Sequence, residues 1–291
     1  MDAGPNERRA VAAACAVASE RGVRCERARV LHSASNVLVH LRPAPVVARV
    51  MTGTAALHAD PGRWLEREVS VLSFLAPSGV AVRPSSLIAP GPYHQDGLWL
   101  TCWEWVGDHK RGGLEHGPDR LGRSLRDLHV SLSGFAGELG GPLDVQREIE
   151  RLQRQLRPTE ALSRQAIDRL RTRLLALSAP VFAAPLPVQA LHGDVSLGNI
   201  LSTSERLVWN DFEDTFRGPV QWDLAGFVIS LGARGADRAF VARALEAYGW
   251  ADERALAPFV EAQVLYLEIW QHYDAQRRAR SQSPSTRVGC T

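Results

Sequence analysis

Residues 191–201 read LHGDVSLGNIL, and residues 208–213 read VWNDFE. The first stretch places Asp194 and Asn199 in the spacing D-x-x-x-x-N, and the second places Asp211 at the end of an apolar run. The apolar segments on either side predict a pair of strands, 188–191 and 207–212, that brackets the first loop. Two acids and an amide therefore gather at a loop and at the end of the strand that follows it.

These residue types suit phosphoryl transfer. That reaction needs a carboxylate near the attacking hydroxyl, and oxygen ligands that hold Mg²⁺ against the phosphates. Because Mg²⁺ prefers hard oxygen donors and keeps some of its water, one Asn and one Asp can suffice from the protein. We expect Asp194 to be the base, with Asn199 and Asp211 as metal ligands. Any one of these three residues alone would indicate only a turn. The prediction rests on their order and spacing.

The periodicity of the chain predicts an α+β, two-lobed architecture. An N-lobe, 1–105, combines a helix with a small β-sheet, and a larger C-lobe, 106–275, is helical. The Arg/Ser/Pro-rich tail, 276–291, is expected to be disordered. Strands are expected within 29–50 and 98–103, and helices over 6–21 (with Asn6 as N-cap), 63–76, 119–132, 144–156, 160–178, 222–231, 236–248 and 252–273.

Composition narrows the functional class. A net charge of +2 gives no electrostatic case for nucleic-acid binding. Lys110 is the only lysine and lacks the glycine framework of a Walker A motif. The four cysteines form neither a C-x-x-C pair nor a zinc spacing. No apolar window reaches the length of a membrane span, and the short apolar run after Arg9 does not resemble a signal peptide. We expect a cytoplasmic protein with no membrane or nucleic-acid partner.

Residues 192–199, HGDVSLGN, and 210–225, NDFEDTFRGPVQWDLA, resemble the aminoglycoside phosphotransferase and choline-kinase-like family, which has the protein-kinase fold. The resemblance covers roughly residues 30–270. It implies a kinase that uses ATP or GTP and Mg²⁺, with Asp194 as the catalytic aspartate and Asn199 and Asp211 as metal ligands. It also implies that His192 braces the catalytic loop and that Asp223 hydrogen-bonds this loop from below. Protein kinases have an arginine where this chain has Gly193.

The N-lobe resembles the family less closely at the nucleotide site. Ser33-Ala-Ser35-Asn36 takes the place of the nucleotide-covering loop but has no glycine, so the backbone amides and the Ser35 and Asn36 side chains are expected to reach the phosphates. Arg49 stands where the family presents lysine to the α- and β-phosphates. Arginine keeps the charge but is longer and planar.

The remaining nucleotide contacts are expected from one helix and from the hinge. Glu68 resembles the helix glutamate that pairs with that cation, and Glu66 is its competitor on a different face of the helix. Cys102-Trp-Glu-Trp105 resembles the hinge, where backbone groups of Trp103 and Trp105 would meet the purine.

The acceptor is expected to be small, because only 12 positions separate Asp211 from Asp223, too few for a peptide-docking activation segment. Glu261, Glu268 and Asp274 are candidates to bind a cationic antibiotic, or equally the solvated face of a helix. An antibiotic, nucleoside, sugar or amino alcohol all remain open as acceptors. The glycine-free loop and Arg49 motivate an alternative, a non-catalytic nucleotide-binding pseudokinase. The histidines other than His192 are expected to be surface or packing residues.

Overall fold

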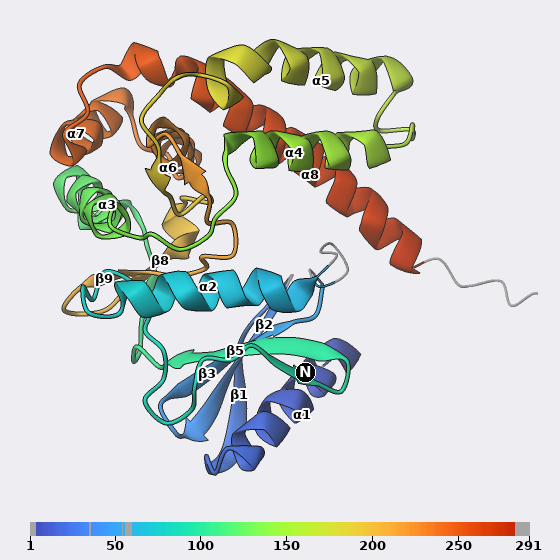
Figure 1. Cartoon of the computed structure of the whole chain (residues 1–291), viewed down its shortest axis with the longest axis vertical. Helices are drawn as coiled ribbons and strands as arrows, with labels where there is room; N and C mark the ends of the chain where they lie inside the picture. The colour runs from blue at the N-terminus through green and yellow to red at the C-terminus, as the bar shows by residue number, and fades with distance from the viewer. Residues whose placement is uncertain (1–3, 35, 54, 56–59, 283–291) are drawn as a thin grey trace, which may run out of the picture.

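The computed structural model describes residues 4–34, 36–53, 55 and 60–282, and shows a sheet-containing N-lobe beneath a larger helical C-lobe (Figure 1). This confirms the expected α+β class. The N-lobe contains a five-stranded antiparallel sheet in the order β1-β2-β3-β5-β4. Its elements are α1 (Pro5–Glu20), β1 (Cys25–Ser33), β2 (Asn36–Pro43), β3 (Val46–Met51), α2 (Pro61–Leu75), β4 (Tyr93–Gln95) and β5 (Leu98–Glu104).

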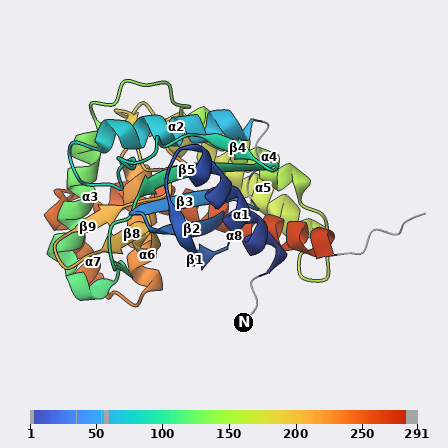
Figure 2. The ribbon, with the colours of Figure 1, turned by 90° about the horizontal axis from the view of Figure 1, so that it is seen from below.

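The N-lobe core follows from the alternation in β2, where Val37, Val39 and Leu41 are buried. Successive strand residues point to opposite faces, so these three side chains lie on one face. The helix α1 packs its small buried residues, among them Ala10 and Ala14, into the same core. Figure 2, viewed from below, shows α1 lying across the sheet. The helix begins at Pro5 after Gly4, which corrects the predicted cap at Asn6.

Helix α2 joins the two lobes. Its N-cap, Asp60, accepts a hydrogen bond from the Arg63 amide. Its buried residues Val71, Leu72 and Leu75 belong to the C-lobe core together with residues of the helix that follows the hinge. The helix also carries Glu68, which is buried although it is charged. The position of α2 therefore fixes the position of this carboxylate between the lobes.

The C-lobe is built from helices with short strands beneath them (Figure 1). The helices occur where the sequence predicts them, with ends shifted by a few residues. The C-lobe elements are β6 (Lys110–Arg111), η2 (Leu114–His116), α3 (Pro118–Leu132), α4 (Pro142–Gln155), α5 (Arg164–Leu177), η3 (Ser178–Phe182), β7 (Gln189–Ala190), η4 (Leu197–Asn199), β8 (Ile200–Ser202), β9 (Leu207–Trp209), β10 (Arg217–Gly218), α6 (Gln221–Ala233), α7 (Arg238–Tyr248), η5 (Glu253–Leu256) and α8 (Ala257–Gln282).

The strands around the central loop pair differently from the prediction. β7 and β9 do not pair with each other: β7 pairs with β10, and β9 pairs with β8. The sequence pattern locates apolar runs but does not specify which run lies beside which. The loop 191–199 therefore begins at one two-stranded sheet and ends at another sheet, so both of its ends are fixed by strand pairing.

The C-terminal helix is longer than the sequence pattern predicts. Helix α8 continues to Gln282, so residues 276–282 are helical rather than part of a disordered tail; residues 283–291 lie outside the described part. No helix among the described residues is both long and apolar enough to span a membrane. Within the same residues Cys15, Cys25 and Cys102 are free thiols.

Candidate active site

Arg49 on β3 and Glu68 on α2 form the ion pair expected of the nucleotide site. The Arg49 Nη1 and Glu68 Oε2 atoms are 3.3 Å apart, and the two residues are only 5% and 1% exposed. The competitor Glu66 lies on the exposed face of α2. Of the two glutamates, Glu68 is therefore the one that pairs with Arg49.

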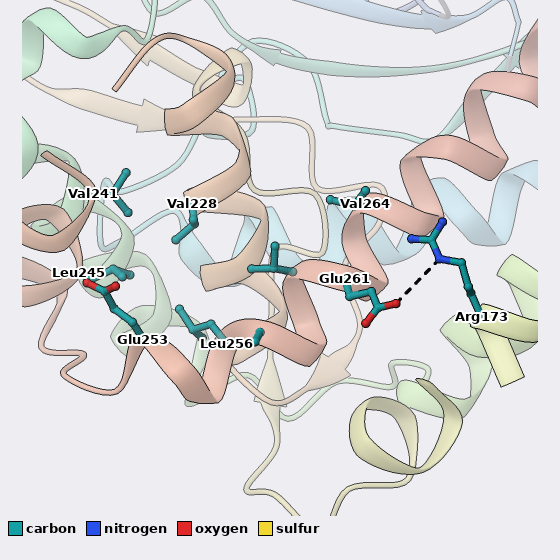
Figure 3. A pocket seen from close by; sticks show the side chains of 10 residues that line it. Arg173, Val228, Val241, Leu245, Glu253, Leu256, Glu261 and Val264 are labelled. Atoms are coloured by element: carbon teal, nitrogen blue, oxygen red, sulfur yellow. Dashed lines mark ion pairs between the residues drawn. The ribbon is translucent and has the colours of Figure 1, made fainter. Parts of the chain in front are cut away.

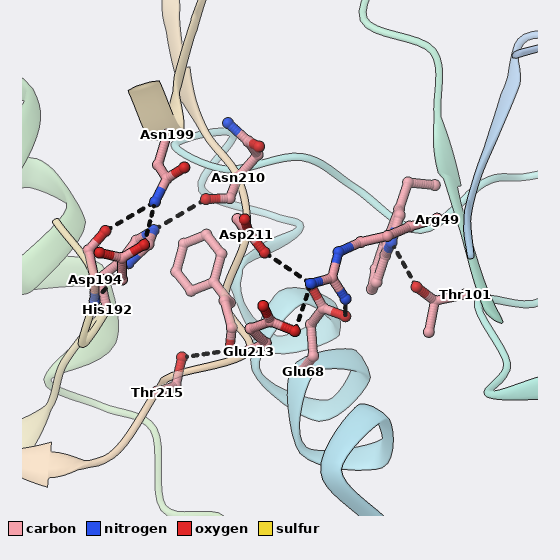
Figure 4. A network of polar contacts seen from close by, with 12 residues as sticks. Arg49, Glu68, Thr101, His192, Asp194, Asn199, Asn210, Asp211, Glu213 and Thr215 are labelled. Carbon is pink, nitrogen blue, oxygen red and sulfur yellow. Dashed lines mark hydrogen bonds and ion pairs between the residues drawn. The ribbon is translucent and has the colours of Figure 1, made fainter. Parts of the chain in front are cut away.

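The same guanidinium reaches two carboxylates of the C-lobe. Arg49 Nη2 lies 2.9 Å from Asp211 Oδ1 and 2.5 Å from Glu213 Oε2 (Figure 4). A lysine offers one point charge, whereas the planar fork of arginine can serve several carboxylates at once. Arg49 thus joins the N-lobe helix α2, through Glu68, to the segment that carries a candidate metal ligand.

Asp194 and Asn199 lie together on the central loop. Asn199 Nδ2 donates to the backbone oxygen of Asp194 at 2.9 Å and to its Oδ2 at 2.9 Å. A short 3₁₀ turn, η4, ends at Asn199 and brings its side chain back toward Asp194. The hydrogen bond fixes the carboxylate that is expected to act as base, and it orients the amide of the expected metal ligand.

Backbone geometry at two positions holds this arrangement. Gly193 has φ of +88°, and a Cβ there would lie 2.0 Å from the Asp214 carbonyl oxygen. Only glycine fits this close approach of two loops. Asp211 itself has φ of +69°, a left-handed conformation that few residues other than glycine adopt. Strained backbone of this kind occurs at sites whose surroundings enforce it.

His192 and Asp223 hold the loop from the protein interior. His192 Nε2 contacts the Asn210 carbonyl oxygen at 3.0 Å, and His192 Nδ1 accepts from the Asp194 amide at 3.3 Å. The buried Asp223 carboxylate accepts from the His192 and Gly193 amides at 2.8 and 3.0 Å. These contacts tie the loop of Asp194 to the strand end that bears Asp211.

The residues present fit a divalent cation that binds through oxygen. Because Asn199 Nδ2 is directed at Asp194, the amide oxygen is left on the side of Asp211 (Figure 4). The Asp211 side chain is 35% exposed, and Arg49 contacts its Oδ1 atom. Among the described residues, no three His, Cys, Asp or Glu side chains form a metal-binding group by themselves. The remaining ligands of Mg²⁺ would be phosphate oxygens and water, as that ion prefers.

Burial and mutual repulsion raise the pKa values of the carboxyl groups in this cluster. Burial raises the pKa of Glu68 to about 7, although Arg49 opposes the shift. Burial also raises the pKa of Asp194 and of Glu213. The pKa of Asp214 is raised well above its usual range by burial and by its acidic neighbours Glu213 and Asp194. The carboxyl groups of this cluster therefore hold protons more readily than exposed acids do.

Three backbone amides of the hinge segment, where a purine was expected to bind, are already hydrogen-bonded within the protein. The backbone amides of Cys102, Glu104 and Trp105 already donate to carbonyl oxygens, those of Pro90, Arg83 and Pro45. Trp103 is buried and its indole donates to Thr101, as expected for a packing side chain. Trp105 stacks on His40, with ring centroids 4.3 Å apart.

The glycine-free loop is described only in part. Asn36 begins β2, and its carbonyl oxygen accepts from the Ala34 amide. Ser35, the other predicted phosphate contact, lies outside the described residues. The role of both residues therefore stays a prediction.

The acids proposed for the acceptor are paired elsewhere. Glu261 and Glu268 both contact Arg173 of α5, at 3.8 and 3.0 Å, and Asp274 contacts Arg277 and Arg278 at 2.7 Å. They form ion pairs on the helix surfaces, which agrees with the alternative interpretation of a solvated face.

A tyrosine of α8 is influenced by acids on and beside the central loop. Burial, followed by the carboxylates of Asp214, Asp194 and Glu148, raises the pKa of Tyr266 on α8 well above its usual range. No motif in the sequence specifies a role for Glu148 or Tyr266. For Asp214, its position directly after the DFE motif was an available signal.

A separate pocket lies among α5, α6, α7 and α8 (Figure 3). Its walls are mainly apolar, with Val228, Leu256 and Val264 among them, and the Arg173–Glu261 ion pair lies at one side. Asp194, Asn199 and Asp211 do not line it. The polar cluster between the lobes, rather than this pocket, contains the groups that phosphoryl transfer needs.

Residues 24–259 of the sequence match the phosphotransferase enzyme family. The chain belongs to this family. The matched region contains the residues that meet between the lobes, whereas Tyr266 lies beyond it. These residues are Arg49, Glu68, Asp194, Asn199, Asp211 and Glu213. No curated protein matches the sequence significantly.

Solved structures share the fold of this phosphotransferase family member at low sequence identity. The amicoumacin kinase hAmiN in complex with AMP-PNP, Ca²⁺ and Ami has a TM-score of 0.70 and 12% identity, over 92% of this chain and 89% of that one. The choline kinase LicA of Streptococcus pneumoniae has a TM-score of 0.68 and 13% identity, over 91% of each chain. An aminoglycoside phosphotransferase, APH(2")-IIia, with GDP and kanamycin has a TM-score of 0.63 and 16% identity, over 93% of each chain.

Proposed function

We propose that this family member transfers the γ-phosphoryl group of ATP or GTP to a hydroxyl of a small molecule. One observation carries the proposal: Asp194, Asn199 and Asp211 come together beside the guanidinium of Arg49. Such a site combines a base, oxygen ligands for a cation and a positive group for phosphate. The nucleotides and small molecules bound by the similar structures support the same class of reaction.

Asp194 is proposed to orient the acceptor hydroxyl and accept its proton. Burial raises the pKa of its carboxyl, which moves a general base closer to neutrality and makes proton transfer more favourable. The hydrogen bond from Asn199 fixes one carboxylate oxygen. The other oxygen is then available to the substrate, and most of the rate enhancement comes from positioning and charge neutralisation.

Asn199 and Asp211 are proposed to hold Mg²⁺, which neutralises phosphate charge when it is bound. The Asp211 carboxylate contributes its exposed side to this role, while Arg49 keeps its Oδ1 atom in place. Arg49 is proposed to contact the α- and β-phosphates in place of lysine. Glu68 and Glu213 also pair with Arg49, so carboxylates of both lobes anchor the guanidinium.

The acceptor is proposed to bind between the central loop and α8, near Asp214, Glu148 and Tyr266. Antibiotics, nucleosides, sugars and amino alcohols all carry a suitable hydroxyl. A role in antibiotic resistance would follow only if the acceptor is an antibiotic. We place the reaction in the cytoplasm, where ATP and GTP are available.

A phosphorylation screen tests the proposal. Wild-type protein is incubated with ATP or GTP, Mg²⁺ and a panel of hydroxylated antibiotics and metabolites, and products are identified by their gain of one phosphoryl group. Transfer to at least one acceptor, lost in Asp211→Asn, supports the proposal. Metal-dependent nucleotide binding without transfer to any acceptor would favour the pseudokinase alternative instead.

A further inference from the structure

Asp223 has a third partner that neither the reaction nor the sequence motifs explain. Besides the amides of His192 and Gly193, its Oδ2 atom contacts His129 Nε2 at 3.0 Å. Asp223 is fully buried and His129 is 3% exposed. A buried carboxylate is costly unless hydrogen bonds satisfy it, and these three contacts satisfy Asp223.

His129 is in turn held by a residue from another helix. Its Nδ1 atom lies 2.7 Å from the hydroxyl oxygen of Tyr248, the last residue of α7. Helices α3 and α7 approach closely at Gly122, where a Cβ would lie 2.1 Å from the carbonyl oxygen of Ala244. Gly122 is two turns before His129 and Ala244 is one turn before Tyr248, so this close contact brings the hydroxyl within reach of the imidazole.

The protons in this chain of contacts can be assigned from chemistry. A carboxylate only accepts, so His129 Nε2 must carry the proton that Asp223 receives. In neutral imidazole Nδ1 is then an acceptor, and the Tyr248 hydroxyl donates to it. Burial raises the pKa of Tyr248 to about 12, so the hydroxyl keeps its proton at ordinary pH. The bonds then run from Tyr248 through His129 and Asp223 to the amides of the central loop.

We propose that Tyr248 and His129 are positioning residues, which act through Asp223 to hold the His192–Gly193–Asp194 loop in its reactive geometry. Their effect on turnover rests on the phosphotransferase function proposed above; their effect on the loop does not. The loop responds because the Asp194 amide donates to His192 Nδ1, and the His192 amide donates to Asp223. A change at the end of α7 therefore reaches the proposed base.

Histidine-labelled protein gives a direct test of the proton assignment. Long-range ¹H–¹⁵N NMR spectra should show His129 as a neutral ring protonated at Nε2, assigned by its loss in His129→Gln. In Tyr248→Phe the Nδ1 resonance should move toward the position of an acceptor without a donor. A ring protonated at Nδ1 alone, or at both nitrogens, would overturn the proton assignment.

Amide hydrogen exchange tests the effect on the loop. Tyr248→Phe removes one hydroxyl and should raise the exchange rates of the His192 and Gly193 amides about fivefold, the effect of losing one buried hydrogen bond. His129→Gln keeps an amide donor for Asp223 and should give a similar change. Tyr93→Phe is the matched control, because its hydroxyl donates to the Ala89 carbonyl in the N-lobe, far from the central loop in the fold. Unchanged exchange at both amides in Tyr248→Phe would overturn the inference.

Kinetics with an acceptor found in the screen separate positioning from simple stability. The kcat of Tyr248→Phe should fall about fivefold while the KM for nucleotide changes less, because Arg49 and the other proposed N-lobe contacts of the nucleotide do not touch the His192–Gly193–Asp194 loop. A wild-type kcat, or an equal change in Tyr93→Phe, would contradict the role in catalysis. If the wild type transfers phosphate to no acceptor, the proposed function fails, whereas exchange and NMR still decide whether Tyr248 holds the loop.

Discussion

Arg49 Nη2 and Asp211 Oδ1 lie 2.9 Å apart although 162 positions separate the two residues in the sequence. The contact joins the central strand of the N-lobe sheet to the strand end that provides a candidate metal ligand. Arg49 also pairs with Glu68 and Glu213, so it forms ion pairs with carboxylates of both lobes. Arg49, at the position where lysine was expected, therefore pairs with three carboxylates through one guanidinium.

Replacing Arg49 by methionine is expected to destabilise the protein by about 3–5 kcal/mol, because Glu68 is left buried without its cation. Arg49→Lys keeps the charge and should cost less, because lysine serves fewer of the three carboxylates. Denaturant unfolding measures both changes. Equal stability of Arg49→Met and wild type would mean that the buried pair does not stabilise the fold.

Stability should depend on pH through Glu68. Its pKa is raised from 4.5 to about 7 in the folded protein, so folding favours its protonated form. The resulting stabilisation is fully present below pH 4.5 and is lost as the pH rises through about 7. In Glu68→Gln the free energy of unfolding should therefore decline less steeply than in wild type between about pH 5 and pH 8. Parallel curves for the two proteins would contradict the shifted pKa.

Asn199→Ala is expected to weaken Mg²⁺-dependent nucleotide binding about tenfold or more, because the side chain provides an oxygen ligand and also fixes Asp194. Calorimetric titration of nucleotide at several Mg²⁺ concentrations measures the effect. Asn210→Ala is the matched control, since this neighbouring residue contacts His192 through its backbone oxygen. Similar losses in both variants would point to general damage of the loop rather than to a lost ligand.

Gly193→Ala should disrupt the central loop, because φ is +88° and the added Cβ would meet the Asp214 carbonyl. The backbone conformation alone costs about 1–3 kcal/mol. In α6, a Cβ added at Gly232 would have open space around it among the described residues, so Gly232→Ala should be neutral or stabilise the helix by about 0.5–1 kcal/mol. Thermal unfolding compares the two. A Gly193→Ala protein as stable as Gly232→Ala would refute this account of the loop.

Local patterns in the sequence predicted much of the fold. The alternation of Val37, Val39 and Leu41 identified the buried face of β2, and the helical periodicities located the C-lobe helices. Strand partners were not predictable in the same way. The apolar runs before and after the central loop belong to different sheets, because pairing depends on distant segments such as β10.

The candidate site was predictable where a motif specified it. Asn199 contacts Asp194, Asp211 contacts Arg49, and Glu68 rather than Glu66 pairs with Arg49, whereas the roles of these residues stay predictions. His129 was expected only to be a surface or packing residue, because one histidine in an amphipathic helix has no distinguishing pattern. Its role depends on Asp223 and Tyr248, 94 and 119 positions away, which only the packing of α3 against α6 and α7 brings together.

The central claim is that Asp194 is the base of a phosphoryl-transfer site, and single-turnover transfer from radiolabelled nucleotide tests it most directly. Asp194→Ala should bind nucleotide and Mg²⁺ with affinity close to that of wild type, because its side chain is not a proposed ligand of either. Its transfer rate to the acceptor found in the screen should fall about 10²- to 10⁴-fold. A variant that still transfers phosphate at the wild-type rate would contradict the account.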